Sequence, residues 1–210
     1  MIYVTVPGDT VSSISRQSGV PAWKIIYDNQ LGEEGKLTVG QALLLLKPQE
    51  SAEIRENLYV TGYAYPFIEP YVLEMAFPAL NELLVFSYGF TFEGELVPPI
   101  QDETWMIQLA WENGIEPMLV LTPFTQGVFN NQLIQTLVEE ESVRENVITN
   151  LLKVVEEKGY VGVDVDFEYV RAQNREGYAE FVGELRAAMN EKGYRVSVAL
   201  APKTSSDQKG

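Results

Sequence analysis

Apolar and polar positions in the first part of the chain follow the pattern of a small mixed domain. Residues 2–6 form a short apolar run typical of a strand. Two short helices are predicted next, the first capped by Asp9 or Thr10, and residues 37–46 return as a second strand. The pattern predicts a β-α-α-β unit over residues 1–47, with both helices packed on one two-stranded sheet.

From residue 58 onward, strand-like and helix-like segments alternate. The strand candidates are residues 58–65, 83–90, 117–122, 161–168 and 194–201. The helical segments between them are residues 71–80, 103–113, 143–158 and 175–192. Ser142 and Glu145 fit a capping box at the start of the third helix.

This alternation favours parallel strands joined by right-handed crossovers. No glycine-rich phosphate loop follows the first strand, which argues against a nucleotide-binding fold. Residues 58–210 are therefore expected to form an incomplete (β/α)8 TIM barrel with about five of its eight strands. Residues 48–57 are polar and lack periodicity, so they are the expected linker between the two domains.

The amino-acid composition excludes several kinds of catalytic and metal-binding site. The 210 residues include no cysteine and no histidine, which excludes disulfides, thiolate nucleophiles, serine–histidine triads and histidine-bound zinc. Acid–base chemistry must then come from Asp, Glu, Lys or Tyr. The formal charge of −15 repels phosphate backbones and anionic lipid, so neither nucleic acid nor a membrane is an expected partner. The N-terminus carries no recognisable signal peptide.

An acidic row stands out in residues 162–169. Asp164, Asp166 and Glu168 alternate with apolar residues, so a strand places the three carboxylates on one face and the apolar residues, up to Tyr169, on the other. In a barrel the carboxylates point inward, and Glu168 lies nearest the C-terminal rim, where barrel enzymes carry their chemistry. Burial and mutual repulsion raise at least one pKa in such a row, which suits acid-catalysed glycoside cleavage. Two other interpretations stay open: an edge strand with a solvated acidic face, and a divalent-metal site.

Residues 161–168 (Val-Gly-Val-Asp-Val-Asp-Phe-Glu) resemble the fourth-strand signature of family 18 glycoside hydrolases, Asp-Gly-x-Asp-x-Asp-x-Glu. Val161 stands where that pattern has its first Asp, and residues 119–124 lack the Ser-x-Gly-Gly usual on the third strand. With these departures the chain resembles the spore and cell-wall branch of the family, the N-acetylglucosaminidases that act on peptidoglycan, more than the chitinase branch.

The resemblance implies a role for each carboxylate. Glu168 would be the general acid that protonates the leaving glycosidic oxygen. Asp166 would hold and polarise the substrate N-acetyl group, whose carbonyl oxygen attacks the anomeric carbon, and Asp164 would share a proton with Asp166. This substrate-assisted retaining route needs no metal and no other cofactor. The aromatic residues at predicted strand ends, which either stack on sugar rings or pack within the barrel, are Tyr63, Tyr65 and Tyr88.

The N-terminal unit resembles a LysM module, which binds glycans that contain N-acetylglucosamine. The resemblance rests on residues 3–11, 25–29 and 37–41. It implies a shallow glycan groove whose expected lining residues are Gly8, Asp9, Thr10, Asn29, Gln30 and Leu31. Trp23 is expected in the core of this unit rather than at the sugar.

Together these features predict a glycosidase that cleaves peptidoglycan or a chitin-like glycan at the cell wall or spore surface, anchored by its LysM module. The alternative is a non-catalytic LysM protein that binds glycan or anchors to the spore coat or cell wall. Because only about five barrel strands are expected, this chain alone is predicted to have little or no glycosidase activity. Its open sheet edge is a possible surface for self-association.

Overall fold

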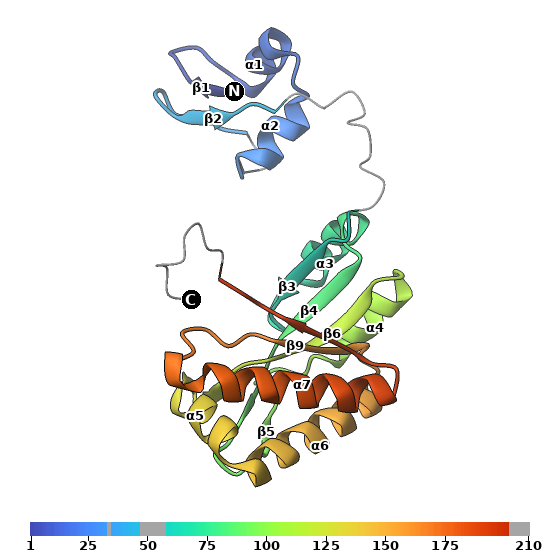
Figure 1. The fold of residues 1–210 in the computed structure, drawn as a ribbon. Helices are drawn as coiled ribbons and strands as arrows, with labels where there is room; N and C mark the ends of the chain where they lie inside the picture. The colour runs from blue at the N-terminus through green and yellow to red at the C-terminus, as the bar shows by residue number, and fades with distance from the viewer. Residues whose placement is uncertain (33–34, 47–57, 202–210) are drawn as a thin grey trace. The chain divides into compact units, whose positions relative to one another are not determined.

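A computed structural model describes residues 1–32, 35–46 and 58–201. The chain divides into two compact units, Met1–Leu58 and Tyr59–Gly210, here called the N-terminal and the C-terminal unit (Figure 1). The predicted linker, residues 48–57, lies outside the described residues. In the part of the chain that is described, no helix has the length and apolar character needed to cross a bilayer.

The N-terminal unit has the predicted β-α-α-β order. Its elements are β1 (Ile2–Val4), α1 (Val11–Ser18), α2 (Ala22–Asp28) and β2 (Ala42–Leu44), and β1 pairs antiparallel with β2. Thr10 caps α1: its hydroxyl accepts a hydrogen bond from the Ser13 amide, and the Ser13 hydroxyl accepts one from the Thr10 amide. Gly19 ends α1 in the left-handed region, at φ 73°.

The core of this unit lies between the two helices and one face of the sheet. Its buried residues are Val11, Ile14, Val20, Ile25, Leu43 and Leu45. The prediction that Trp23 belongs to this core is wrong, because Trp23 is 68% exposed. Helix α2 turns Ile25 inward, and residues two positions away on a helix point to the opposite side. Trp23 and Tyr27 therefore both lie on the outer surface.

Strand β2 is shorter than the predicted segment 37–46. Residues 38–41 form a turn instead, in which the Thr38 amide donates to the Gln41 side chain at 3.0 Å and the Gly40 amide donates to the Thr5 carbonyl at 2.8 Å. Gly40 has a φ of 84°, a conformation that glycine adopts without strain. The turn uses the backbone groups that a longer strand would have paired.

The C-terminal unit alternates strands and helices as predicted. Its strands are β3 (Thr61–Ala64), β4 (Glu82–Phe90), β5 (Leu96–Val97), β6 (Glu116–Leu121), β7 (Phe124–Thr125), β8 (Val128–Phe129), β9 (Gly162–Val165) and β10 (Arg195–Val198). Its helices are α3 (Pro70–Ala76), α4 (Thr104–Glu112), α5 (Gln132–Glu139), α6 (Glu141–Lys158) and α7 (Arg175–Glu191), with short 3-10 turns η1 (Phe77–Ala79) and η2 (Ala172–Asn174).

Five of these strands form one parallel sheet, in the order β10-β9-β6-β4-β3. Each strand lies beside the one before it in the chain, which is the winding of a barrel rather than of a doubly wound open sheet. The described part of this unit is thus an incomplete (β/α)8 barrel. Helices α6 and α7 lie one beneath the other below β9 in Figure 1 and contact β9 and β10 respectively.

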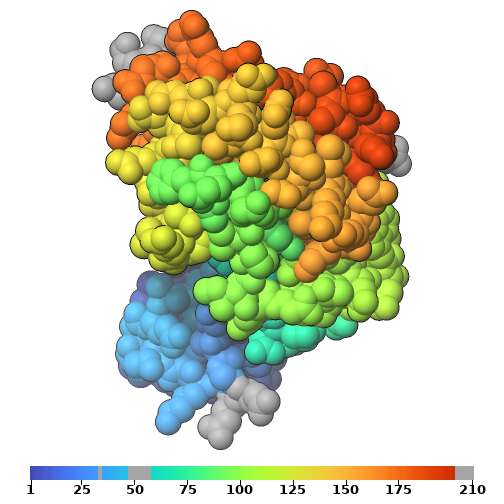
Figure 2. All heavy atoms as spheres, turned by 90° about the horizontal axis from the view of Figure 1, so that it is seen from below, coloured from blue at the N-terminus to red at the C-terminus, as the bar shows by residue number. Residues whose placement is uncertain are grey.

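The main core fills the space between the sheet and its helices. Alternate residues of each strand enter it, such as Val163 and Val165 of β9, both fully buried. Figure 2 shows α5 and α6, in yellow and amber, packed against each other with the green turn after β4 lying beside α6. Asn146 and Asn150 of α6 donate to backbone carbonyls of that turn at 3.0 Å each.

Two expectations about helices differ from the structure. The capping box predicted at Ser142 and Glu145 is wrong: the residue before α6 is Glu140, which makes no side-chain cap hydrogen bond. Helix α5 ends at Glu139, so a single residue separates the two helices and Ser142 already lies inside the first turn of α6. Neither α5 nor the β7–β8 hairpin was predicted from the sequence.

Candidate active site

The acidic row begins on β9, an inner strand of the sheet. Asp164 is 2% exposed, and its neighbours Val163 and Val165 point into the helix-covered core. Because β9 pairs with β6 on one side and β10 on the other, the interpretation of this segment as an edge strand is wrong. Asp164 therefore lies on the inner, concave side of the barrel sheet.

The row continues beyond the end of β9. The Asp166 amide still donates to the Leu121 carbonyl at 2.9 Å. Phe167 returns to the core, where its ring stacks on Phe90 and Phe181 at centroid distances of 5.9 and 6.1 Å. Asp166 and Glu168 consequently face away from the core, and exposure rises along the row: Asp164 is buried, Asp166 is half-buried and Glu168 is exposed.

Tyr169 ends the row. It was expected on the apolar face, but it is 71% exposed and has a φ of 56°. A side chain in the left-handed region no longer follows the alternation of a strand. The described residues also contain no group of three or more acidic side chains placed to hold a metal ion, so the three carboxylates do not converge as the metal-site interpretation required.

Asp164 accepts a hydrogen bond on each carboxylate oxygen. The Tyr63 hydroxyl of β3 donates to Oδ2 at 2.7 Å, and the Ser197 hydroxyl of β10 donates to Oδ1 at 2.5 Å. These two donors come from opposite edges of the five-stranded sheet. Asp164 thus ties the first described barrel strand to the last.

Burial and neighbouring charge shape the acid–base properties of this region. Burial, followed by the charges of Glu168 and Asp164, raises the pKa of Asp166 above its ordinary value. Burial and the hydrogen bond to Asp164 raise the pKa of Tyr63 well above its ordinary value, so its phenol stays protonated. The row therefore contains one half-buried carboxyl group with an increased tendency to hold a proton, next to an exposed one at the rim.

The predicted aromatic residues have different surroundings. Tyr65, 48% exposed, stacks on Phe67 at a centroid distance of 4.9 Å and lies at 4.8 Å from Phe86. Phe67 is itself 67% exposed. Tyr63 lies edge-on to Phe86 at 6.3 Å while its hydroxyl contacts Asp164. These rings form an aromatic group around the C-terminal end of β3 and the middle of β4.

Tyr88 does not belong to that group. It is 3% exposed, and its hydroxyl donates to Glu103, at the start of α4, at 2.5 Å. The pairing of β4 with β6 shifts register between Val85 and Tyr88, and such a shift exchanges the faces of the residues that follow. Tyr88 therefore points to the helices rather than into the barrel, and its assignment as a sugar-stacking residue is wrong.

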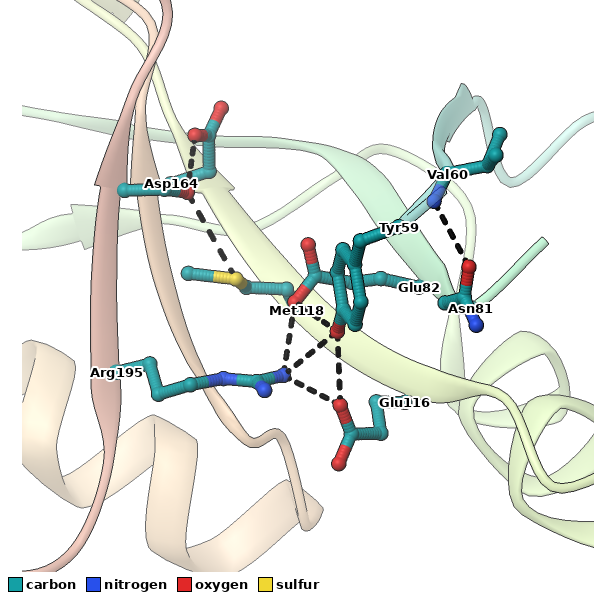
Figure 3. A network of polar contacts seen from close by, with 9 residues as sticks. Tyr59, Val60, Asn81, Glu82, Glu116, Met118, Asp164 and Arg195 are labelled. Atoms are coloured by element: carbon teal, nitrogen blue, oxygen red, sulfur yellow. Dashed lines mark hydrogen bonds and ion pairs between the residues drawn. The ribbon is translucent and has the colours of Figure 1, made fainter. Parts of the chain in front are cut away.

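The opposite end of the barrel interior is closed by an ion network (Figure 3). Arg195 Nη2 lies 2.9 Å from Glu82 Oε1, 2.6 Å from Glu116 Oε2 and 3.3 Å from the Tyr59 hydroxyl. Three of these residues are the first of their strands, so the network marks the N-terminal ends of β4, β6 and β10. Burial raises the pKa of Glu82 and Arg195 opposes this, whereas hydrogen bonds from Arg195 and Tyr59 lower the pKa of Glu116.

A cavity of about 400 Å³ extends from this network to Asp164. Its lining also includes Tyr63, Met118 and Ser197. Asp164, the first residue of the carboxylate row, and the ion network thus face one open pocket from its two ends.

In the N-terminal unit, three of the predicted groove residues use their side chains internally. Asp9 Oδ2 accepts from the Val6 amide at 2.7 Å and from the Tyr3 hydroxyl at 2.9 Å. Thr10 is the cap of α1. The Asn29 side chain donates to the Ile25 and Leu44 carbonyls, at 2.9 Å each, and accepts from the Leu44 amide at 2.6 Å. These side chains shape the two turns.

The other three predicted groove residues differ in their availability. Gly8 has a φ of 90°, and its Cα faces open space. Gln30 is exposed, with a φ of 50°. Leu31 is half-buried and packs against the core. The backbone near Gly8 and the Gln30 side chain are therefore the groups most available to a ligand.

Sequence reading missed three residues around the carboxylate row: Ser197, Phe67 and Phe86. A signal for Ser197 was present, because Arg195 and Ser197 alternate with Val196 and Val198 and so share the inner face of β10. Phe86 alternates with Val85 in the same way, at the point where the register shift begins. Phe67 lies in a loop, where no periodicity indicates its direction.

Two segments of the chain match known protein families. Residues 3–45 match the LysM domain model, and residues 127–209 match the model of glycosyl hydrolases family 18. The cortical fragment-lytic enzyme of Bacillus subtilis (strain 168) is 29% identical over 260 residues, covering 100% of this chain and 60% of its own length. The Bacillus cereus enzyme of the same name is 30% identical over 254 residues, covering 97% and 58%. The chain thus spans less than two thirds of the length of these curated relatives.

Solved structures agree with the sequence comparison. The Bacillus cereus spore cortex-lytic enzyme SleL matches with a TM-score of 0.64 at 29% identity, covering 100% of this chain and 48% of that one. A class V chitinase from Pseudomonas fluorescens Pf-5 matches with a TM-score of 0.65 at 22% identity, covering 71% and 47%, and shares the fold. The chain therefore combines a LysM domain with part of a glycosyl hydrolase domain of family 18.

Proposed function

We propose that the protein containing this chain is a glycosidase that cleaves cell-wall glycan containing N-acetylglucosamine, and that its LysM domain holds it on that glycan. The observation that carries the proposal is the row Asp164, Asp166 and Glu168, whose exposure rises from the barrel interior to the rim. Family 18 membership makes substrate-assisted retaining cleavage the expected route, an exception to the usual two-carboxylate scheme.

Each carboxylate has surroundings that suit its proposed role. Glu168, exposed at the rim, protonates the leaving glycosidic oxygen. Asp166, whose raised pKa favours the protonated form, holds and polarises the N-acetyl group while its carbonyl oxygen attacks the anomeric carbon. Asp164, fixed by Tyr63 and Ser197, shares the proton of Asp166 during the reaction.

The exposed rings of Tyr65 and Phe67 provide a stacking surface beside this row. Sugar rings present apolar C–H faces that pack on aromatic rings. The pair lies directly after β3, the strand that carries Tyr63, so a glycan stacked there would extend from the carboxylate row along the rim. We assign Tyr65 and Phe67 to substrate binding on this ground.

Peptidoglycan is the proposed substrate and the spore or cell wall the proposed location. Relatives named as cortical fragment-lytic enzymes support both, as does the presence of a LysM domain. In that domain the backbone near Gly8 and the side chain of Gln30 are the proposed glycan contacts, while Asp9, Thr10 and Asn29 maintain the turns.

A second candidate function is glycan binding without catalysis. It is favoured by the match of residues 3–45 to the LysM domain model. The described residues contain five barrel strands, where a closed barrel has eight. On this basis we expect the 210-residue chain alone to pellet with peptidoglycan and to release little or no product. Robust turnover by this chain alone would contradict that expectation.

Mass spectrometry of fragments released from purified peptidoglycan decides between the two functions. The full-length protein should release fragments ending at N-acetylglucosamine, and its Glu168→Gln variant should not, although both should pellet with the glycan. The matched control is Glu176→Gln on α7, an acidic residue outside the row, which should keep parental activity. Pelleting without release by the parent protein would favour the binding function.

A further inference from the structure

We propose that Ser197 is a positioning residue that keeps Asp164 a hydrogen-bond acceptor, so that the proton shared within the carboxylate row resides on Asp166. This inference rests on the proposed glycosidase function and assigns to it a residue of the fifth barrel strand. It begins from the pairing of β9 with β10, in which Ser197 lies directly opposite Asp164.

Asp164 accepts one hydrogen bond from a neutral donor on each of its two carboxylate oxygens. Ser197 donates to Oδ1 at 2.5 Å and Tyr63 donates to Oδ2 at 2.7 Å. Hydrogen bonds accepted on both oxygens favour the charged form of a carboxyl group, which accepts and does not donate. Each oxygen has a second lone pair, so Asp164 can still accept a third hydrogen bond from a protonated Asp166.

Ser197 is exposed, and its position is set by the strand that carries it. Its hydroxyl also contacts the Met118 sulfur at 3.9 Å, and its backbone belongs to the parallel ladder between β9 and β10. The hydroxyl therefore reaches Asp164 from a strand rather than from a loop. Donors placed on rigid elements hold a catalytic group more exactly than donors on loops.

The charged and titratable groups that face Asp164 come from several elements. Tyr63 on β3, Glu82 on β4 and Tyr178 on α7 each feel the charge of Asp164, as does Asp166 beyond the end of β9. Arg195 of β10 lines the same cavity, but its guanidinium pairs with Glu82 and Glu116. Asp164 thus depends on hydroxyl donors, and one of the two is Ser197.

Loss of the Ser197 hydroxyl should therefore change how the row holds protons. Without this donor, Asp164 loses one of the two hydrogen bonds that favour its charged form, so the shared proton is drawn from Asp166 towards Asp164. The row as a whole then takes up a second proton more readily at the acidic end of the working range. A hydrogen bond to a charged group is strong enough for an effect of roughly tenfold, or about one pH unit.

The test compares the full-length protein with Ser197→Ala, Ser197→Thr and Ser142→Ala, using purified peptidoglycan and pH–rate profiles. Ser197→Ala should lower kcat about tenfold with little change in KM, and should move the acidic limb of the kcat profile to higher pH. Ser197→Thr keeps a hydroxyl and should stay near the parent profile. Ser142→Ala, on the exposed surface of α6, should leave kcat and the profile unchanged.

Each outcome has a distinct meaning. No product from the parent protein overturns the proposed function and this inference with it. An active parent and a Ser197→Ala variant with the parental profile overturn this inference alone, as does a loss of thermal stability without a shifted limb. If Ser197→Ala does not fold, Ser197→Cys, which has a similar volume and only a weak donor, should show the same shift, and its absence would also overturn the inference.

Discussion

The two ends of the barrel interior differ in how their carboxylates are compensated. At the N-terminal ends of the strands, Glu82 and Glu116 share the guanidinium of Arg195 within 2.9 Å. At the other end, Asp164 has only hydroxyl donors, and burial and like charge raise the pKa of Asp166. A buried carboxylate that has a cation as its partner destabilises the fold when that cation is removed, whereas carboxylates without a cation suit proton transfer. The comparison indicates that one end holds the strands together and the other carries the chemistry.

The largest expected effect tests the chemical end. Glu168→Gln in the full-length protein should lower kcat on peptidoglycan by about a thousandfold, because an amide cannot protonate the leaving oxygen. The melting temperature should stay within about a degree of the parent, because Glu168 is exposed. Steady-state kinetics and calorimetry measure the two values. A large fall in melting temperature with the activity retained would reverse the assignment of the two ends.

The structural end should respond in the opposite way. Arg195→Met leaves the buried Glu82 without its cation, and we expect a loss of about 2 kcal/mol in the free energy of unfolding, less than for a fully buried pair because Arg195 is half exposed. Urea unfolding of the chain at pH 7 measures this loss. Lys153→Met removes an exposed partner of Glu157 and serves as the control, with little expected change. Equal stability of the two variants would contradict a stabilising role for the network.

The sequence made the chemical end far easier to predict than the structural end. Asp164, Asp166 and Glu168 lie within five positions, and strand alternation alone places them on one face. Arg195 and Glu82 are separated by 113 positions, so their contact depends on the register of the three strand pairings that connect β10 to β4. Tyr88 was misplaced because the register shift in β4 leaves no mark in the apolar pattern. Trp23 was misplaced because α2, with seven residues, is too short for periodicity to fix its inward face.

A smaller effect is expected from the pH dependence of stability. The pKa of Asp166 is raised in the folded state, so ionisation costs stability once the pH rises above the ordinary value, and the cost is absent at pH values below it. Asp166→Asn removes this cost, and the chain should melt at a slightly higher temperature at pH 7 but at the parental temperature at pH 3. Thermal unfolding at both pH values measures the difference. A variant that is less stable than the parent at pH 7 would contradict an unfavourable charge at this position.

The smallest expected effect extends the same comparison to the LysM domain, where the side chain of Asn29 is fully engaged and that of its neighbour Gln30 is exposed. Gln30→Ala should weaken pelleting of the chain on peptidoglycan a few-fold without a change in melting temperature, since one exposed hydrogen bond is worth about 1 kcal/mol. Asn29→Ala should instead destabilise the domain by about 2 kcal/mol, because three hydrogen bonds are lost. Binding isotherms and thermal melts of both variants distinguish a residue that contacts the glycan from one that stabilises the domain. Unchanged binding by Gln30→Ala would leave the backbone near Gly8 as the main glycan contact, because the other turn residues are held by the fold itself.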